Sequence, residues 1–239
     1  MANNLKWKWT VVVLIAMLVF IVYVVLHTML YNPWKAVVLT LPRLSHRTEP
    51  LMVQLKQRGI PSEIVYGVDG KEMVENSDDE EKKRLVETYG TLRVGEIGCT
   101  MSHMSLWRKI AAMPDRAKIL IFEDDADFCG PPIVLPDVPY DFIYYGYLAN
   151  FGFEKRRSPA FVRTFGHAGT HTYHVTPEGA RKILQEYKAN PKLLRQPVDL
   201  ALMTLFEERQ DRFIVYSQHP RATHQRGEAT SVQTSEQVE

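Results

Sequence analysis

Cysteine is scarce in this chain of 239 residues, which contains only Cys99 and Cys129. Two cysteines cannot build a disulfide framework, and they lack the paired spacing of a zinc motif. Net charge is also nearly absent, because 29 basic and 28 acidic residues leave a formal charge of +1. This balance removes the support for a general nucleic-acid or polyanion binder. No internal repeat is apparent.

Firmly charged side chains are missing from Thr10 to Tyr31, an apolar run long enough to cross a hydrocarbon core of ~30 Å as a helix. Aromatic residues lie at both ends of the run, as in interfacial belts. A cleaved signal peptide is the alternative, but the run is long and lacks a small-residue cleavage site. We therefore expect residues 1–9 to be a short basic tail and residues 10–31 a transmembrane signal-anchor. Lys6 and Lys8 before the span favour a single-pass type II membrane protein whose following domain is luminal.

The rest of the chain can bury a core, since 45% of all residues are hydrophobic and 24% charged. Apolar runs with strand character alternate with helical patterns, which predicts an α/β domain with a mostly parallel sheet over residues 35–226. Residues 76–83 form a charge run that reads as a solvated loop or helix face, and residues 227–239 as a loose polar tail. Strands are expected at 36–41, 62–66, 119–122, 142–145, 170–175 and 213–216, and helices at 49–58, 96–112, 177–187 and 200–208.

One of these strands, Ile119–Phe122, ends in a cluster of carboxylates at Glu123, Asp124, Asp125 and Asp127. Carboxylates are costly to bury, so a cluster at a strand's carboxyl end calls for a neutralising partner. Mg²⁺ or Mn²⁺ with oxygen ligands is the usual one, often together with a diphosphate. Alternation along a strand would put Glu123, Asp125 and Asp127 on one side. The alternative is a solvated acidic turn.

Several segments, in order, resemble glycosyltransferase family 25, which includes lipopolysaccharide-type and collagen galactosyltransferases. Leu39–Arg47 is similar to the family's opening I-N-L-D-R-x-x-D-R. The later motifs are Val68-Asp-Gly70, Val94-Gly-Glu-Ile-Gly-Cys-Thr-Met-Ser-His103 with Leu106-Trp107, Leu120-Ile-Phe-Glu-Asp-Asp125, Gly169-Thr-His-Thr-Tyr173 with Gly179-Ala180, and Pro197-Val-Asp199. Each motif alone is weak, but six in order are specific. The resemblance implies a GT-A-like nucleotide-diphospho-sugar transferase fold, preceded here by the transmembrane helix.

The resemblance also implies roles for single residues. Glu123, Asp124 and Asp125 would serve the metal–diphosphate site, with Glu123 and Asp125 facing Mn²⁺ or Mg²⁺. Arg43, Arg47, Asp69, Ser102, His103 and Asp124 would bind the UDP-sugar donor, or brace the metal strand in the case of Ser102 and His103. The opening motif departs from the family at Thr40, Pro42 and His46, where Asn, Asp and Asp are usual.

Inversion at the sugar carbon needs a base for the acceptor hydroxyl, and Asp199 is the candidate. A helix N-cap is its ordinary alternative. Late histidines, His219 or His224, are further candidates for the metal, and Asp127 reads as a solvated extra carboxylate.

The sequence thus predicts a metal-dependent glycosyltransferase. It would move a hexose, with UDP-galactose the expected donor, onto a glycan or hydroxylated acceptor. One alternative is a catalytically silent relative acting as an anchored binding or adhesion module. Another is a metal-dependent phosphohydrolase, which explains neither Gly95-Glu-Ile-Gly98 nor Val68-Asp-Gly70.

Overall fold

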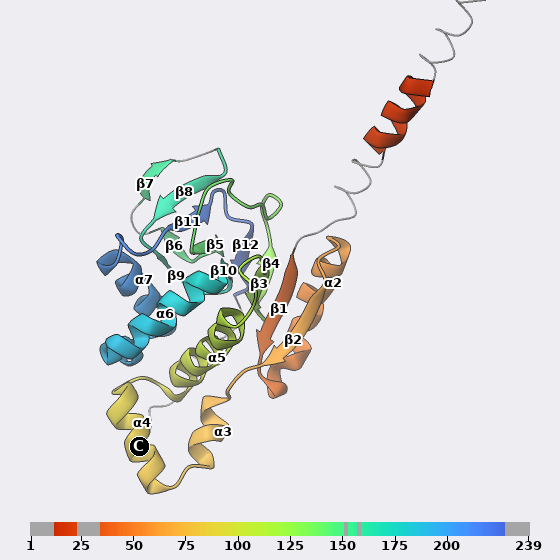
Figure 1. Ribbon diagram of the computed structural model, residues 1–239. Coiled ribbons are helices and arrows are strands. Elements are labelled where there is room, and N and C mark those ends of the chain that lie inside the picture. The colour runs from red at the N-terminus through yellow and green to blue at the C-terminus, as the bar shows by residue number, and fades with distance from the viewer. Residues whose placement is uncertain (1–11, 23–33, 151–152, 157–158, 228–239) are drawn as a thin grey trace, which may run out of the picture. The chain divides into compact units, whose positions relative to one another are not determined.

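The computed structural model describes residues 12–22, 34–150, 153–156 and 159–227 (Figure 1). The chain divides into two units, Met1–Trp34 and Lys35–Glu239. Residues 12–22 form an exposed helix, which at ~1.5 Å per residue extends about 16 Å, short of the ~30 Å of a hydrocarbon core.

Within the described ranges, no helix has the length and apolar composition needed to cross a membrane. The predicted transmembrane helix over residues 10–31 is therefore wrong, and with it the single-pass type II location. Residues 10–11 and 23–31 of that span, the predicted basic tail 1–9 and residues 228–239 of the predicted polar tail lie outside the described residues.

The second unit is a mixed α/β arrangement. Its strands are β1 (Lys35–Thr40), β2 (Ser62–Tyr66), β3 (Ile119–Glu123), β4 (Ala126–Phe128), β5 (Phe142–Gly146), β6 (Ala149–Asn150), β7 (Phe153–Arg156), β8 (Phe161–Thr164), β9 (His167–Ala168), β10 (Thr172–Val175), β11 (Val215–Gln218) and β12 (Thr223–Gln225). Its helices are η1 (Pro42–Thr48), α2 (Glu49–Gln57), α3 (Gly70–Glu75), α4 (Asp79–Tyr89), α5 (Val94–Ala111), α6 (Pro177–Ala189), η2 (Pro191–Arg195) and α7 (Val198–Glu208).

The main sheet has the strand order β2-β1-β3-β10-β5-β11-β8-β7. β1 pairs in parallel with β2 and β3, and β5 with β11, but β10 runs antiparallel to both β3 and β5. β8 and β7 continue the sheet in antiparallel pairing. The prediction of a mostly parallel sheet is therefore wrong. The connection from β5 to β10 contains the short strands β6 to β9 and no described helix. Parallel pairing of β5 with β10 would require a longer crossover connection, usually a helix, so the two strands pair antiparallel.

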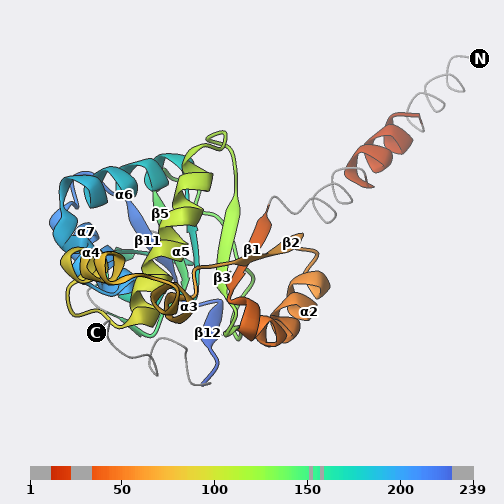
Figure 2. The ribbon, with the colours of Figure 1, turned by 90° about the horizontal axis from the view of Figure 1, so that it is seen from below.

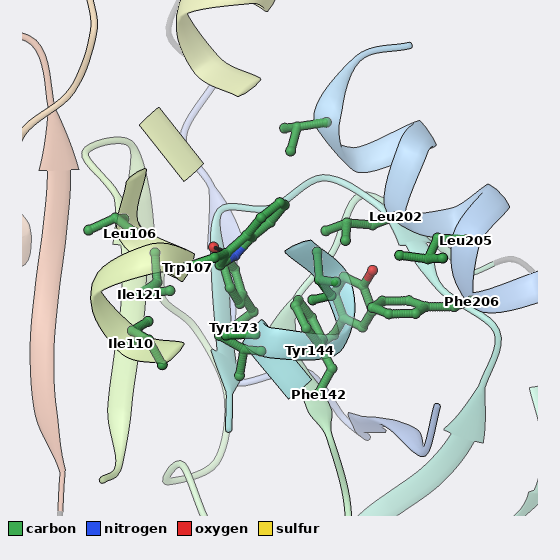
Figure 3. Close-up of a cluster of buried hydrophobic side chains, with 14 of the residues drawn as sticks. Leu106, Trp107, Ile110, Ile121, Phe142, Tyr144, Tyr173, Leu202, Leu205 and Phe206 are labelled. Atoms are coloured by element: carbon green, nitrogen blue, oxygen red, sulfur yellow. Dashed lines mark hydrogen bonds between the residues drawn. The ribbon is translucent and has the colours of Figure 1, made fainter. Parts of the chain in front are cut away.

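Helices α5, α6 and α7 cover one face of the sheet, and α2 lies on the opposite side of β1 (Figure 2). The core fills the space between the three helices and the strands, with Trp107, Phe142, Tyr144, Tyr173 and Phe206 at its centre (Figure 3). All five are buried, and the Phe142 and Tyr173 rings stack with centroids 4.8 Å apart. This core fixes α5 against the middle strands, and so fixes the residues that α5 carries toward the sheet edge.

The carboxyl ends of β1 and β3 meet at one edge of the sheet, because the two strands are parallel and in register, with Leu39 opposite Glu123. The loop after β2 reaches the same edge, where the Gly67 amide donates to the Thr40 carbonyl oxygen over 2.8 Å. The antiparallel β10 begins there. One edge therefore gathers the ends of four neighbouring strands, where open α/β sheets bind ligands.

Candidate active site

A cavity of about 640 Å³ lies at this edge. Its volume is within the usual range for small-molecule sites, ~300–1,000 Å³. All nine side chains that the sequence proposes for the site line this one cavity, although they come from segments spread over more than 150 residues. They are Arg43, Arg47, Asp69, Ser102, His103, Glu123, Asp124, Asp125 and Asp199.

The acidic cluster spans the turn between β3 and β4. β3 ends at Glu123, Asp124 and Asp125 form a turn, and β4 begins at Ala126. Strand alternation does not extend across a turn, so the expected common side for Glu123, Asp125 and Asp127 is not observed. Asp127 instead accepts a hydrogen bond from Gln54 and is not among the residues that line the cavity.

Two arginines face the carboxylates. Arg47 Nη2 lies 3.5 Å from Asp124 Oδ1 and 3.6 Å from Asp125 Oδ2, and its side chain is only 9% exposed. Arg43 Nε donates to Asp69 Oδ2 over 2.5 Å, with 48% of the Arg43 side chain exposed. Arg47 is therefore buried beside the acidic turn, whereas Arg43 is half-exposed.

Each carboxylate of the turn has its own hydrogen-bond donor. Glu123 Oε1 accepts from the Thr170 hydroxyl over 2.6 Å. Asp124 Oδ2 accepts from the Thr40 hydroxyl over 2.5 Å, and Asp125 Oδ2 from the Gln225 amide over 2.7 Å. Three segments distant in sequence thus each donate one hydrogen bond to these carboxylates.

The three carboxylates titrate differently. Burial opposes ionisation of Glu123, but the neighbouring His103 imidazole and Thr170 hydroxyl outweigh it and hold the pKa of Glu123 below its ordinary value. Burial raises the pKa of Asp124. Burial also raises the pKa of Asp125, to about 7, and repulsion from Glu123 adds to the rise. The turn holds more negative charge than its surroundings compensate.

This excess suits a divalent cation. Asp125 Oδ1 is buried and has no hydrogen-bond partner among the described residues, although an unsatisfied carboxylate oxygen is costly. The cavity is lined by seven carboxyl groups against three basic side chains. An oxygen-rich, electron-rich set of this kind has the donor chemistry that Mg²⁺ and Mn²⁺ prefer. The residues present therefore fit such an ion.

Ser102 has a structural position in the cavity wall. Its hydroxyl accepts from the Val68 amide over 2.8 Å and donates to the Gly98 carbonyl oxygen over 2.6 Å. Two glycines allow this close approach of α3 and α5. A Cβ on Gly98 would lie 2.6 Å from the Val68 carbonyl oxygen, and one on Gly70 would lie 1.8 Å from the Val94 carbonyl oxygen. The glycines of both motifs thus bring Asp69 and Ser102 to the cavity.

His103 lies beneath the turn. It is fully buried, with Nε2 3.3 Å from Glu123 Oε1 and Nδ1 2.8 Å from the Tyr173 hydroxyl oxygen. Trp107 Nε1 donates to the same hydroxyl oxygen over 2.9 Å. His103 therefore braces the last residue of β3, which is one of the two roles that the sequence leaves open for it.

Asp199 is the second residue of α7, and Pro197 occupies the N-cap position. Its Oδ2 accepts from the Gly169 amide and its Oδ1 from the Leu200 amide, each over 2.9 Å. The carboxylate therefore ties the start of α7 to the loop before β10. This geometry differs from the simple N-cap that is the ordinary alternative for this aspartate.

Sequence reasoning missed the side chains that hold the turn. Thr40 occupies a position that departs from the family pattern, and Thr170 lies inside a family motif without having been singled out. Gln225 and Arg226 follow the last predicted strand. Arg226 Nη2 donates to the Asp124 carbonyl oxygen over 2.6 Å and to the Arg47 carbonyl oxygen over 2.8 Å.

The two late histidines lie elsewhere. His224 Nε2 is 3.9 Å from Asp127 Oδ2, and His219 Nδ1 is 3.4 Å from the Tyr147 hydroxyl oxygen. Neither is among the described residues that line the cavity.

Comparison with known proteins places these observations in a family. Residues 35–130 match the model of glycosyltransferase family 25 (LPS biosynthesis protein). Among curated relatives, "Inactive glycosyltransferase 25 family member 3" of Homo sapiens is 28% identical over 191 residues, covering 72% of this chain and 31% of the relative. "Glycosyltransferase 25 family member" of Anopheles gambiae is 27% identical over 189 residues, covering 71% and 31%. A relative with the same name in Drosophila pseudoobscura pseudoobscura is 29% identical over 188 residues, covering 71% of this chain and 29% of the relative.

The matched region thus spans about a third of the length of these curated relatives. The family model covers the first four motifs, and the relatives match most of the chain. They confirm the resemblance to glycosyltransferase family 25 that the motifs indicate.

Proposed function

We propose that this chain transfers a hexose, with galactose from UDP-galactose the expected donor, onto a hydroxyl group of a glycan or hydroxylated acceptor. The reaction would require Mn²⁺ or Mg²⁺ and would invert the sugar carbon. One observation carries the proposal: the proposed metal, donor and base residues, from distant segments, line a single cavity.

The acidic turn supports the donor half of the proposal. A divalent cation bound by Glu123 and Asp125 would stabilise the charge that develops on the departing nucleoside diphosphate. Arg47, within 3.6 Å of Asp125, orients that carboxylate and adds positive charge beside the turn. Arg43 and Asp69 line the same cavity and form an ion pair there, where they can meet the rest of the donor.

Asp199 supports the acceptor half. It lines the cavity from a different element, and each of its oxygens keeps a lone pair after accepting one backbone N–H. One of these lone pairs can take the proton of an acceptor hydroxyl. The two N–H bonds hold the carboxylate in place, which a general base needs for reach.

A catalytically silent binding module is the second candidate. The observation that favours it is that four of the curated relatives carry the word inactive in their names. Such a protein would keep the cavity and the fold without turnover. Against it stands Asp125 Oδ1, whose buried and unsatisfied position is a cost that a cation would relieve.

Donor hydrolysis and metal binding separate the two candidates. The full chain is incubated with a panel of UDP-sugars with and without Mn²⁺, and UDP release is followed. We expect metal-dependent release that is greatest with UDP-galactose. Calorimetry on the same preparation gives UDP and Mn²⁺ affinities. Tight binding without release for any sugar would favour the silent module, and absence of both would overturn the proposal.

A further inference from the structure

The cavity also contains a cluster of softer ligands. Cys99 and His103 are four residues apart on α5, so they project from the same face of the helix. That face meets the end of β3 at Glu123. One ligand atom from each of Cys99, His103 and Glu123 lies within 4.8 Å of the others.

The spacing within the cluster matches a tetrahedral ion. Two nitrogen or oxygen ligands at about 2.0–2.1 Å from a tetrahedral zinc ion are about 3.3–3.4 Å apart. His103 Nε2 and Glu123 Oε1 are 3.3 Å apart. This separation allows both atoms to bind one ion without a large movement of either side chain.

His103 is also oriented for this role. Nε2 is buried and makes no hydrogen bond of acceptable geometry within the described part of the chain. The Tyr173 hydroxyl oxygen accepts from Trp107 and has a second lone pair for an Nδ1–H of His103. In that tautomer Nε2 has a lone pair for an ion bound between His103 and Glu123, and the ion would take the place of a proton shared by the two groups. Histidine ligands of metals usually donate their other ring N–H in this way.

We propose that Cys99, His103 and Glu123 form a site for a borderline-soft transition metal ion, Zn²⁺. All three line the cavity, so a fourth position faces the cavity, as in zinc sites with three protein ligands. On binding, the Cys99 thiol proton leaves to solvent and the thiolate sulfur donates to the ion. The thiolate favours Zn²⁺ over Mn²⁺ and Mg²⁺. The proposal goes beyond sugar transfer: it shares Glu123 with the cation site proposed for that reaction, but its test does not measure transfer.

The test uses Co²⁺ as a spectroscopic probe on the full chain with Cys129→Ser. Cys129 is exposed, whereas Cys99 is the cluster residue and is then the chain's only thiol. We expect one equivalent of Co²⁺ to produce a near-ultraviolet thiolate-to-cobalt charge-transfer band that Zn²⁺ abolishes. Because the cluster itself is unchanged, a folding defect at the site cannot obscure the result. Absence of the band overturns the proposal.

His103→Asn, made in the same Cys129→Ser background, tests the second ligand. We expect the affinity for Co²⁺ to fall at least ~10-fold, as is typical when the shell of a metal site is disturbed. Circular dichroism and thermal unfolding check that the variant is folded. If it does not fold, calorimetry of the Cys129→Ser protein between pH 5 and 7.5 replaces it, since Zn²⁺ binding displaces the Cys99 thiol proton and should weaken as the pH falls. Unchanged affinity in either experiment contradicts a histidine–thiolate site.

Discussion

Asp125 differs from the two carboxylates before it because one of its buried oxygens, Oδ1, has no hydrogen-bond partner in the described structure. We predict that Asp125→Asn lowers Mn²⁺-dependent transfer by about 10²–10³-fold, since a preorganised electrostatic contact is worth about 3–4 kcal/mol. The fold should persist, because the amide removes a charge that burial and Glu123 already oppose. UDP release and Mn²⁺ affinity are measured together.

Asp127→Asn is the matched control for this prediction. Asp127 is two residues away and carries the same group, but it contacts Gln54 and His224 and is not among the cavity residues. It should leave turnover nearly unchanged. Near-normal Mn²⁺-dependent activity in Asp125→Asn would refute the metal assignment.

Asp199 carries a second prediction. If Asp199 is the general base, Asp199→Asn should abolish transfer, while the affinities for UDP and Mn²⁺ stay nearly unchanged. The substitution also has a structural cost, because an amide offers one acceptor oxygen to the two backbone N–H groups of Gly169 and Leu200. Leaving one of them unsatisfied costs about 1–3 kcal/mol.

Thermal unfolding of Asp199→Asn measures that structural cost separately from turnover. Full transfer activity in a folded protein would show that Asp199 only ties α7 to the loop before β10. Lost donor binding would instead assign it to the nucleotide or metal site.

Residue types could be read from the motifs, but their contacts could not. Ser102 lies in a motif, yet its partner at Val68 is 34 positions away, and Gln225 reaches Asp125 across 100 positions. Local patterns carry no information on such contacts, which depend on how the sheet brings strand ends together. The nine proposed residues lie in one cavity, but their individual contacts were not predictable from the sequence.

At the scale of elements, periodic patterns predicted the longer helices well. The predicted helix at 96–112 is α5, Val94–Ala111, and the strand at 62–66 is β2. The charge run at 76–83 contains the first residues of α4, whose N-cap is Asp78 with Glu81 completing a capping box. That spacing was visible in the sequence. Short strands such as β4 and β12 are held by pairing with each other, which no local signal reveals.

The contact between α3 and α5 gives an element-scale prediction. Gly98→Ala should destabilise the protein by about 1–3 kcal/mol, because an added methyl group would overlap the backbone of Val68 and Gly70. Alanine otherwise favours a helix by about 1 kcal/mol, so a loss of stability reports the close contact.

Ser105→Ala, at an exposed position of the same helix, is the control and should be nearly neutral. Urea unfolding gives the free energies of both variants. Equal stability of Gly98→Ala and the parent protein would mean that the two helices can separate without cost.

At the scale of the whole molecule, the boundary at Trp34 and Lys35 leads to a further prediction. A chain shortened to residues 34–239 should unfold at the same temperature as the full chain. Trp34 is retained because it is buried, with 5% exposure. Circular dichroism during heating measures the midpoint. A clearly lower midpoint, or aggregation of the short chain alone, would show that residues before Trp34 contribute to the second unit.

A buried histidine that does not line the cavity contributes to acid stability. His174, on β10, is fully buried, and burial lowers its pKa to about 4, while its Nδ1 lies 2.8 Å from the Ile119 carbonyl oxygen. Its folded-state pKa is below the ordinary value of about 6.5, so the unfolded chain binds the proton more readily. Its neutral form therefore contributes stability above pH 6.5 that is lost as the pH falls toward 4.

The sign of this linkage gives the last prediction. Asp125 acts in the opposite direction, since its folded-state pKa is raised, so the total pH dependence alone does not isolate His174. His174→Gln removes only the contribution of His174 to the pH dependence of the unfolding free energy. The difference in unfolding free energy between the parent protein and the variant should be about 2 kcal/mol smaller at pH 5.0 than at pH 7.5. At pH 5.0 the unfolded parent chain gains a proton on His174 that the folded parent does not bind, and the variant has no such group. Urea unfolding of both proteins at the two pH values measures the difference. A destabilisation that is the same at both would show that His174 is protonated equally in the folded and unfolded states.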